Sequence, residues 1–496
     1  MNLAHIIEGH APEHVAIISR GIETTYAELT DRVARVRGGL AKLGIGADDR
    51  VALLCGNGIC FVETYLALLG LGAVVVPMNP QSPAPEIEQE IVAVGACAVV
   101  IEPAAAAAWN GIGTEAARSV RTVIAVEPGS IEGAVSFEDL VVADPLGVVE
   151  VDSDVLAVLI FTSGTAGSPR AAMLSHGNLL ANIDQGHSAA ASINADDVVY
   201  GVLPMFHIFG LNVMLGFSLA IGATIVLVQR FDPSTALDTI RERGVTVIPG
   251  APPLWLTFSH FDGAPADSFA TVRLALTGAA KMPEEAIRRL QQRFGVQLAE
   301  GYGLTEASPV VTSSAGLPSK VGSVGKVLDG MTVRLVDEDG DDVLQGDAGE
   351  VWVKGPNVFL GYLDDPEQTA RVLTADGWLR TGDIAVTDDD GYLYLVDRAK
   401  DLIIVSGFNV YPAEVENVIA EHPAVAEVGV VGVPHPHTGE AVKAWVVVHE
   451  GKSVDEDTLI AWCNEHLARY KSPSKVLFVD ELPRNVSGKL LRRSLT

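Results

Sequence analysis

Residues 155–170 read VLAVLIFTSGTAGSPR, an apolar run followed directly by a loop of glycine, serine and threonine that ends on an arginine. An apolar run of this length is typical of a buried strand. The glycines let successive backbone N–H groups point into one concavity, the hydroxyl groups add donors, and Arg170 adds a fixed positive charge. The loop therefore suits a polyphosphate, although the same composition is also typical of an ordinary turn.

The first half of the chain alternates short apolar runs with helical patterns. Thr25 and Glu28 form a capping box, and apolar residues follow it at helical spacing as far as Leu43. A second helical pattern covers about residues 58–69, and runs of strand type lie at residues 51–54, 73–77, 98–101 and 122–126. This alternation predicts an α/β fold whose parallel-rich sheets are buried on both faces.

The second half of the chain changes in character after about residue 319. Short strands with turns, at residues 332–336 and 349–353, predict a small β-barrel-like subdomain. A charged stretch at residues 397–401 follows, and the remainder has an α+β pattern that includes a helix capped at Ser453. We therefore expect a second, smaller domain beyond the charged stretch.

Composition excludes several classes of function. The 496 residues are 48% hydrophobic and 20% charged, which is typical of globular proteins. With 34 Lys and Arg against 63 Asp and Glu, the formal net charge is −29, so the molecule as a whole repels nucleic acid. The four cysteines show no metal-binding or disulfide spacing, which favours a reducing, cytoplasmic location.

One segment is long and apolar enough to raise the question of a membrane span. Residues 198–229 contain no Asp, Glu, Lys or Arg. Pro204, Gly216 and Gly222 interrupt the segment, however, and such breaks are costly within a bilayer. The pattern favours a helix from about Phe209 to Ala220 and then a buried strand, so we expect no membrane span.

Further motifs follow the glycine-rich loop in a fixed order. In EGYGLTE, an aromatic ring between two glycines could lie against a base, and the final carboxylate could hold Mg²⁺. The motifs are EGYGLTE (residues 300–306), TGD (381–383), DRAKDLIIVSG (397–407), YPAEVE (411–416) and PRNVSGK (483–489). Together they resemble the acyl-adenylate-forming superfamily, which includes acyl-CoA synthetases and coumarate:CoA ligases, from Thr25 to Lys489.

The resemblance implies a two-step reaction with ATP, Mg²⁺ and CoA. A carboxylic acid and ATP would give acyl-AMP and pyrophosphate, and CoA would then take the acyl group. It also implies an N-terminal AMP-binding domain over residues 1–396, a hinge at residues 397–401 that pivots at Lys400, and a mobile C-terminal lid domain over residues 402–496. No nucleic acid partner is implied, and the oligomeric state stays open.

The resemblance also assigns roles to individual residues. Lys489 and Thr305 would act at the α-phosphate, and Glu306 would ligate Mg²⁺ together with Thr165. The remaining ATP and AMP contacts would be Thr162, Ser163, Gly164, Thr165, Ala166, Gly167, Arg170, Gly278, Ala279, Ala280, Gly301, Tyr302, Gly303, Asp383 and Arg398, and the CoA side would include Ser406, Gly407 and Phe408. Simpler interpretations are a solvated helix-start acid for Glu306, a turn acid for Asp383 and a mobile terminal cation for Lys489.

The phosphate loop departs from the family pattern at two positions. Ala166 stands where a threonine is common, and Arg170 stands where a lysine is common. The first change removes a hydroxyl donor. The second keeps the charge but presents a planar fork in place of a point charge.

The acyl pocket is expected around the segment PMFHIFG, residues 204–210. His207 stands where amino-acid-activating members would carry an aspartate, which argues against an amino acid substrate; a core histidine is the alternative. Phe206, His207, Gly210 and Trp255 suggest an apolar pocket. We expect a fatty acid, with an aryl acid of the coumarate type as the alternative.

The sequence disfavours two rival functions. A fatty acyl-AMP ligase that loads a carrier protein typically carries an insertion, and no obvious extra segment lies between Gly325 and Asp397. A catalytically inactive homologue is disfavoured because Glu306, Asp383 and Lys489 are all present.

Overall fold

The computed structural model of the chain describes residues 1–162, 170–337, 339–398, 401, 403–405, 408–410, 412–435, 438–467, 469–484 and 490–495. The chain divides into two compact units. The first contains Met1–Val321, Val327–Thr332 and Lys354–Leu379, and the second contains Gly322–Lys326, Val333–Val353 and Arg380–Thr496. The domain borders expected near residues 397 and 401 remain a prediction.

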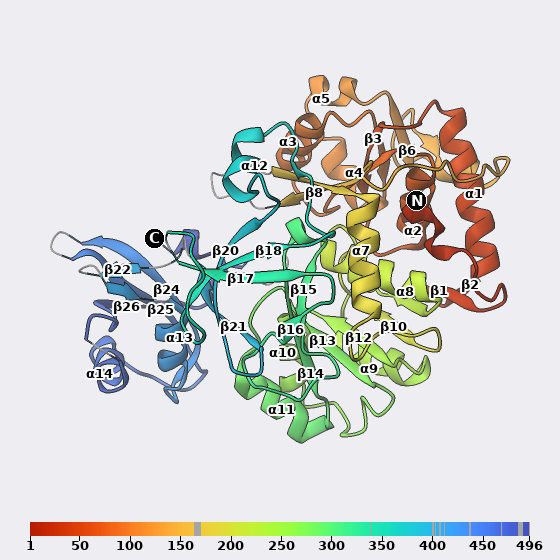
Figure 1. Cartoon of the computed structure of the whole chain (residues 1–496). Coiled ribbons are helices and arrows are strands. Elements are labelled where there is room, and N and C mark those ends of the chain that lie inside the picture. The colour runs from red at the N-terminus through yellow and green to blue at the C-terminus, as the bar shows by residue number, and fades with distance from the viewer. Residues whose placement is uncertain are drawn as a thin grey trace. The chain divides into compact units, whose positions relative to one another are not determined.

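One large mixed sheet of the first unit carries the strands on which the EGYGLTE motif lies (Figure 1). The pairings from β1 through β11, β10, β12 and β13 to β14 are all parallel. Strand β2 pairs antiparallel with β1, and β15 pairs antiparallel with β14. The order is β16 (Lys326–Val327), β15 (Val310–Ser313), β14 (Leu298–Gly303), β13 (Leu274–Thr277), β12 (Val247–Gly250), β10 (Val198–Gly201), β11 (Thr224–Leu227), β1 (Val15–Ser19) and β2 (Ile22–Thr25).

A second mixed sheet of the same unit carries the apolar run at residues 155–160 as its strand β8. Strands β8, β4, β3, β5, β6 and β7 are parallel, β9 pairs antiparallel with β8, and β19 pairs antiparallel with β9. The order is β19 (Gly361–Tyr362), β9 (Arg170–Ser175), β8 (Leu156–Thr162), β4 (Val74–Pro77), β3 (Arg50–Leu54), β5 (Ala98–Ile101), β6 (Thr122–Ala125) and β7 (Val135–Ser136). The predicted parallel-rich α/β fold is confirmed.

Helices connect these strands, and the first of them begins where the sequence predicts. The Thr25 side chain accepts from the Glu28 N–H, and the Thr25 N–H donates to the Glu28 carboxylate at 2.8 Å. The helical elements of this unit are η1 (Leu3–Ile7), α1 (Tyr26–Lys42), α2 (Ile59–Gly70), α3 (Ala84–Val94), α4 (Pro103–Trp109), α5 (Thr114–Ser119), α6 (Phe137–Val141), α7 (His176–His187), α9 (Pro233–Glu242), α10 (Pro252–His260), α11 (Glu284–Phe294), η3 (Thr305–Ala307) and α12 (Pro366–Val372).

The apolar segment at residues 198–229 is buried in the first unit. After β10, η2 (Phe209–Gly216) is a π-helix that continues as α8 (Phe217–Ile221). The sequence predicted a helix in this place, but not that its first part is a π-helix. Such π-helical turns are frequent at functional sites. In the part of the chain that the structure describes, no helix is long and apolar enough to cross a membrane.

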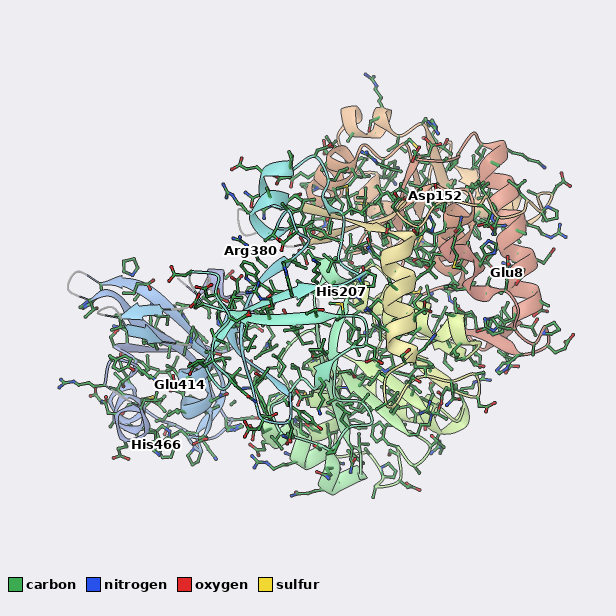
Figure 2. The ribbon with its side chains drawn as sticks, viewed as in Figure 1. Glu8, Asp152, His207, Arg380, Glu414 and His466 are labelled. Atoms are coloured by element: carbon green, nitrogen blue, oxygen red, sulfur yellow. The ribbon has the colours of Figure 1, made fainter. Side chains whose placement is uncertain are left out.

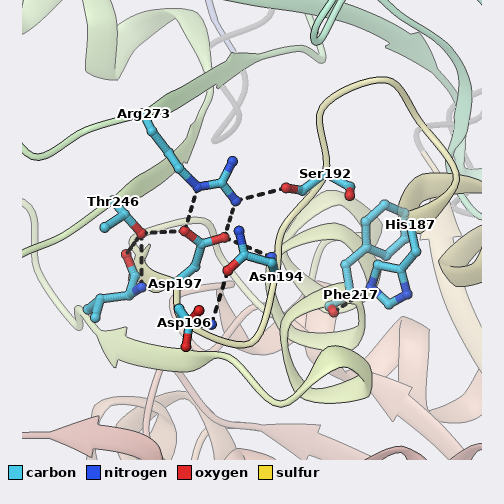
Figure 3. A network of polar contacts seen from close by, with 9 residues as sticks. His187, Ser192, Asn194, Asp196, Asp197, Phe217, Thr246 and Arg273 are labelled. Atoms are coloured by element: carbon cyan, nitrogen blue, oxygen red, sulfur yellow. Dashed lines mark hydrogen bonds and ion pairs between the residues drawn. The ribbon is translucent and has the colours of Figure 1, made fainter.

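A buried carboxylate joins the amino ends of three parallel strands (Figure 3). Asp197 precedes β10 and is 2% exposed; it accepts from the Thr246 hydroxyl, which precedes β12, and from Nε of Arg273, which precedes β13, both at 2.7 Å. The Asn194 N–H adds a third bond at 2.7 Å. Burial opposes ionisation, but these donors hold the pKa of Asp197 below its usual value.

The second unit contains smaller sheets. One has the order β17 (Thr332–Val336), β18 (Gly349–Lys354), β20 (Leu379–Thr387) and β21 (Leu393–Arg398). The other has the order β23 (Phe408–Val410), β22 (Ile403–Val405), β25 (Gly439–Val448) and β24 (Val425–His435), with β26 (Lys475–Phe478) parallel to β25. Helices α13 (Pro412–Ala420) and α14 (Glu456–His466) pack on β24 and β26 respectively, and η5 (Arg492–Ser494) lies near the C-terminus.

The helix expected from Ser453 begins later. The structure starts α14 at Glu456, and the side chain of Asp455 accepts from the Thr458 N–H at 2.8 Å. The prediction of Ser453 as the cap was wrong, because the aspartate two residues further on reaches the free N–H group of the first turn.

Candidate active site

The two ends of the glycine-rich loop lie opposite each other on neighbouring strands. Thr162 ends β8, Arg170 begins β9, and the two residues are cross-strand partners. The Thr162 hydroxyl donates to the Arg170 carbonyl at 3.5 Å. Residues 163–167, expected to contact phosphate, lie outside the described residues, so their role remains a prediction.

Arg170 contacts one residue of strand β19 and one residue that follows it. Its Nε lies 3.7 Å from the Asp365 carboxylate, and the centre of its guanidinium lies 5.8 Å from the centroid of the Tyr362 ring. Asp365 also caps α12 by accepting from the Gln368 N–H at 3.1 Å. The start of α12 therefore sets the direction of the Arg170 side chain.

Glu306 contacts the same tyrosine. The Tyr362 hydroxyl donates to Oε1 of Glu306 at 2.7 Å, and the Phe359 N–H donates to the Glu306 carbonyl at 2.9 Å. Burial raises the pKa of Tyr362, and the negative charge of Glu306 raises it further, so the phenol stays protonated and acts as donor. Glu306 and Arg170, which lie far apart in the sequence, thus share one neighbour.

Buried amide side chains support the turn that carries Thr305 and Glu306. Asn357 Nδ2 donates to the Ala307 carbonyl at 2.6 Å, and Asn212 Nδ2 donates to the Ser308 carbonyl at 2.7 Å. Both asparagines are buried, with 0% and 1% of their surface exposed. Because these donors come from separate segments, the position of Glu306 is a property of the whole fold of the first unit.

The residues expected around adenine lie at the carboxyl ends of adjacent parallel strands. Gly278, which is buried, follows β13, and Tyr302 lies on β14 with 7% of its surface exposed. Ala279 is exposed and adopts φ +71°, an uncommon conformation for a residue with a side chain, and Ala280 is half-buried. At Gly303 a Cβ atom would lie 2.2 Å from the Pro309 carbonyl oxygen, so only glycine fits there.

The segment expected to line the acyl pocket adjoins these residues. A Cβ atom on Gly278 would lie 3.4 Å from the Gly301 carbonyl oxygen and 3.6 Å from Cζ of Phe209. His207, labelled in Figure 2, is half-buried, and its Nδ1 accepts from the Phe209 N–H at 3.2 Å. A neutral His207 therefore carries its ring proton on Nε2. Phe206 is also half-buried.

Two of the expected pocket residues face elsewhere. Trp255 has 0% of its surface exposed, packs against Phe258 and Phe269, and donates from Nε1 to the Leu276 carbonyl at 3.0 Å. It is a core residue, because the helix α10 turns it into the hydrophobic core of the first unit. At Gly210 a Cβ atom would lie 2.1 Å from the Pro204 carbonyl oxygen, so a side chain there would meet backbone and not a bound acid.

The remaining expected residues belong to the second unit or lie outside the described residues. Asp383 on β20 is 7% exposed and is the cross-strand partner of Arg398, the last residue of β21. Phe408 begins β23. Lys400, Ser406, Gly407 and Lys489 lie outside the described residues, as do the side chains of Arg398 and Phe408.

The site is compatible with a magnesium ion brought in with ATP. Among the described residues, no group of three or more His, Cys, Asp and Glu side chains could hold a metal. Mg²⁺ is commonly bound through one or two carboxylates and the phosphates of the substrate. Glu306, with a carboxylate oriented by Tyr362, fits this mode of binding.

Tyr362 and Asp365 lie outside the motifs that predicted the site. Asp365 followed by Pro366 is a typical helix start, so the cap on α12 was detectable. The contacts of both residues with Arg170 arise because β19 pairs with β9, and no local spacing in the sequence indicates that pairing.

The chain matches the AMP-binding enzyme family over residues 5–363 and the AMP-binding enzyme C-terminal domain over residues 414–489. It belongs to the AMP-binding enzyme family. Feruloyl-CoA synthase from Amycolatopsis sp. is 37% identical over 97% of this chain and 95% of its own. 4-Coumarate–CoA ligase 5 from Oryza sativa subsp. japonica is 35% identical over 96% of this chain and 89% of its own. ATP-bound MatB from Rhodopseudomonas palustris superimposes with a TM-score of 0.93 at 33% identity, covering 100% of this chain and 98% of the other.

This AMP-binding enzyme is an AMP-forming acid–CoA ligase, as its motifs predicted. Its reactants are a small carboxylic acid, ATP and CoA, with Mg²⁺ as cofactor. The predicted likeness to coumarate:CoA ligases is confirmed, whereas the fatty acid expected as the first choice of substrate has no support among these relatives.

Proposed function

We propose that the acid activated by this enzyme is aromatic, of the hydroxycinnamate type. The observation that carries the proposal is the 37% identity, over 97% of the chain, with a feruloyl-CoA synthase. The rice relative named as a 4-coumarate–CoA ligase supports the same class of substrate. An aryl acid was the alternative predicted from the sequence beside a fatty acid.

The surroundings of Gly278 support a flat substrate. Gly278, which has no side chain, lies between the Gly301 carbonyl oxygen and the ring of Phe209. An aromatic acid could stack on or meet the edge of that ring, a geometry that adds favourable energy beyond the burial of apolar area. Phe206 and His207 complete the proposed pocket, and Trp255 and Gly210 are left out of it.

The proposed residues divide the work of the first half-reaction. The loop from Thr162 to Arg170 would bind the β- and γ-phosphates, and Tyr302 would lie against adenine. Glu306 would hold Mg²⁺, which supplies positive charge next to the phosphates when it is bound. Thr305 and Lys489 would bind the α-phosphate, where charge gathers during adenylation.

The second unit supplies the other proposed roles. Asp383 would accept hydrogen bonds from the ribose hydroxyls, with Arg398 close to the same sugar. Lys400 would be the hinge, and Ser406, Gly407 and Phe408 would lie on the CoA side.

An acid panel tests the proposed substrate. Ferulate, 4-coumarate, benzoate and saturated fatty acids of increasing length are each incubated with ATP and Mg²⁺, with and without CoA, and pyrophosphate and thioester are measured. We expect kcat/KM for the hydroxycinnamates to exceed that for every fatty acid, with CoA thioester as the product. A preference for fatty acids, or acyl-AMP that CoA does not consume, would overturn the proposal.

A pocket variant tests where the aromatic ring binds. Gly278→Ala places a methyl group at ordinary contact distance from Phe209, so the fold should tolerate it, while the pocket loses volume. We expect KM for ferulate to rise about tenfold, in line with the usual cost of overpacking. Gly147→Ala, at a glycine with nothing within 4 Å of the added Cβ, is the matched control. A rise in KM for ATP alone would assign Gly278 to adenine only.

A further inference from the structure

Tyr362 occupies a position from which it reaches two functional segments at once. Strand β19 pairs with β9 so that Tyr362 lies opposite Ala172, and the Leu363 N–H donates to the Ala171 carbonyl at 2.9 Å. This pairing brings Tyr362 beside Arg170, the first residue of β9 and the last of the glycine-rich loop.

Contacts on every side hold the tyrosine in place. Its N–H donates to the Thr369 hydroxyl at 2.9 Å, and its ring meets that of Phe359 edge to face with centroids 5.0 Å apart. The residue is 8% exposed. A ring packed in this way has little rotamer freedom, so its hydroxyl is a fixed donor and not a mobile one.

The hydroxyl of Tyr362 meets the carboxylate of Glu306. The phenol oxygen lies 2.7 Å from Oε1, an ordinary length for an O–H···O hydrogen bond, and a bond of this kind to a carboxylate is stronger than one between neutral groups. A glutamate side chain otherwise moves among several rotamers, and a fixed donor to one oxygen selects among them. The second carboxylate oxygen can then ligate a cation.

We propose that Tyr362 is a positioning residue that orients Glu306 toward the magnesium ion of MgATP and packs against the Arg170 guanidinium. The inference rests on the roles proposed above for Glu306 and Arg170, and it is independent of which acid is activated. The proposal gives strand β19 a part in ATP binding that neither the glycine-rich loop nor the EGYGLTE motif indicates by itself.

The variant Tyr362→Phe separates this role from simple packing. It removes the hydroxyl and keeps the ring, so the contacts with Arg170 and Phe359 persist. ATP binding is titrated by calorimetry at a series of MgCl₂ concentrations, without any acid. We expect the Mg²⁺ concentration that gives half of the gain in ATP affinity to rise about tenfold, the usual effect of losing a bond to a charged group. ATP affinity without Mg²⁺ should equal that of the parent.

Matched variants exclude a general loss of structure. Tyr394→Phe removes a comparable phenol–carboxylate bond, 3.1 Å long and made to Asp388 in the second unit, and should leave the Mg²⁺ dependence unchanged. In a Glu306→Gln background, Tyr362→Phe should have little further effect, because the two side chains act as one unit. Thermal unfolding of each variant is measured in parallel.

The results separate this inference from the proposed substrate. A Tyr362→Phe variant that keeps the parent Mg²⁺ dependence, or one that weakens ATP binding equally with and without Mg²⁺, would overturn the positioning role. An additive effect in the Glu306→Gln background would overturn it too. Since the titration contains no acid, a wrong choice of substrate would show in the acid panel and not here.

Discussion

At the scale of single residues, Glu300 is a glutamate with a raised pKa. It begins the EGYGLTE motif on β14, and burial raises its pKa to about 7, with Lys281 opposing the shift and Glu284 adding to it. The folded state therefore keeps a proton that the unfolded chain releases near the ordinary glutamate pKa of 4.5. The contribution of Glu300 to the stability of the fold is fully present below about pH 4.5 and is lost as the pH rises through the folded-state pKa of about 7.

The variant Glu300→Gln should remove this pH dependence. At pH 8 we expect the variant to unfold at a higher urea concentration than the parent. Its free energy of unfolding should be larger by on the order of 1 kcal/mol, after allowance for solvent screening. At pH 5 the two proteins should differ much less. Urea midpoints at the two pH values check the prediction, and a constant difference between them would contradict it.

At the scale of elements, Asp197 secures the amino ends of β10, β12 and β13. The proposed site lies at the opposite, carboxyl ends of these parallel strands, where Gly278 and the EGYGLTE motif are found. A fixed register at one end of parallel strands carries through to the other. The network of Figure 3 thus joins these strands at the end opposite the proposed site.

Removing this carboxylate should destabilise the protein strongly. Asp197→Ala removes the carboxylate that accepts from Arg273, Thr246 and the Asn194 N–H, which costs on the order of 2–4 kcal/mol in the free energy of unfolding. Because the folded-state pKa of Asp197 is lowered, the deficit is present above the ordinary aspartate pKa and disappears as the pH falls through the folded-state value. Urea unfolding at pH 7 measures it, with the exposed neighbour Asp196→Ala as control. Equal stability of the two variants would show that the network contributes nothing.

At the scale of the whole molecule, the proposed roles are divided between the two units. Arg170, Glu306 and Tyr302 belong to the first, and Asp383 and Lys489 belong to the second. A variant in the second unit could therefore affect one half-reaction more than the other.

The variant Lys489→Ala should separate the two half-reactions. Loss of a cation at the α-phosphate typically reduces the rate by about 10²–10³-fold, so acyl-AMP formation should fall by that factor. Thioester formation from preformed acyl-AMP and CoA should stay close to the parent rate. Lys475→Ala, at an exposed lysine of the same unit, is the control. Equal losses in both half-reactions would mean that the assignment of Lys489 is wrong.

Much of the fold could be predicted because its signals are local. The capping box at Thr25, the strand before the glycine-rich loop and the alternation of helices and strands each depend on residues a few positions apart. The buried position of Trp255 could not be predicted, since an indole looks the same in a pocket and in a core. The π-helix after β10 was missed for a similar reason: periodicity does not distinguish a wide turn from an ordinary one.

The family and the class of reaction could be predicted from the amino-acid sequence, because each motif is a set of residue types at short spacings. Which of these residues meet could not be predicted in this way. Tyr362 joins Glu306 and Arg170 because β19 pairs with β9 and the Phe359 N–H bonds the turn that carries Glu306. Contacts between residues so far apart along the chain are set by strand pairing and core packing, and the packing of the whole unit determines them.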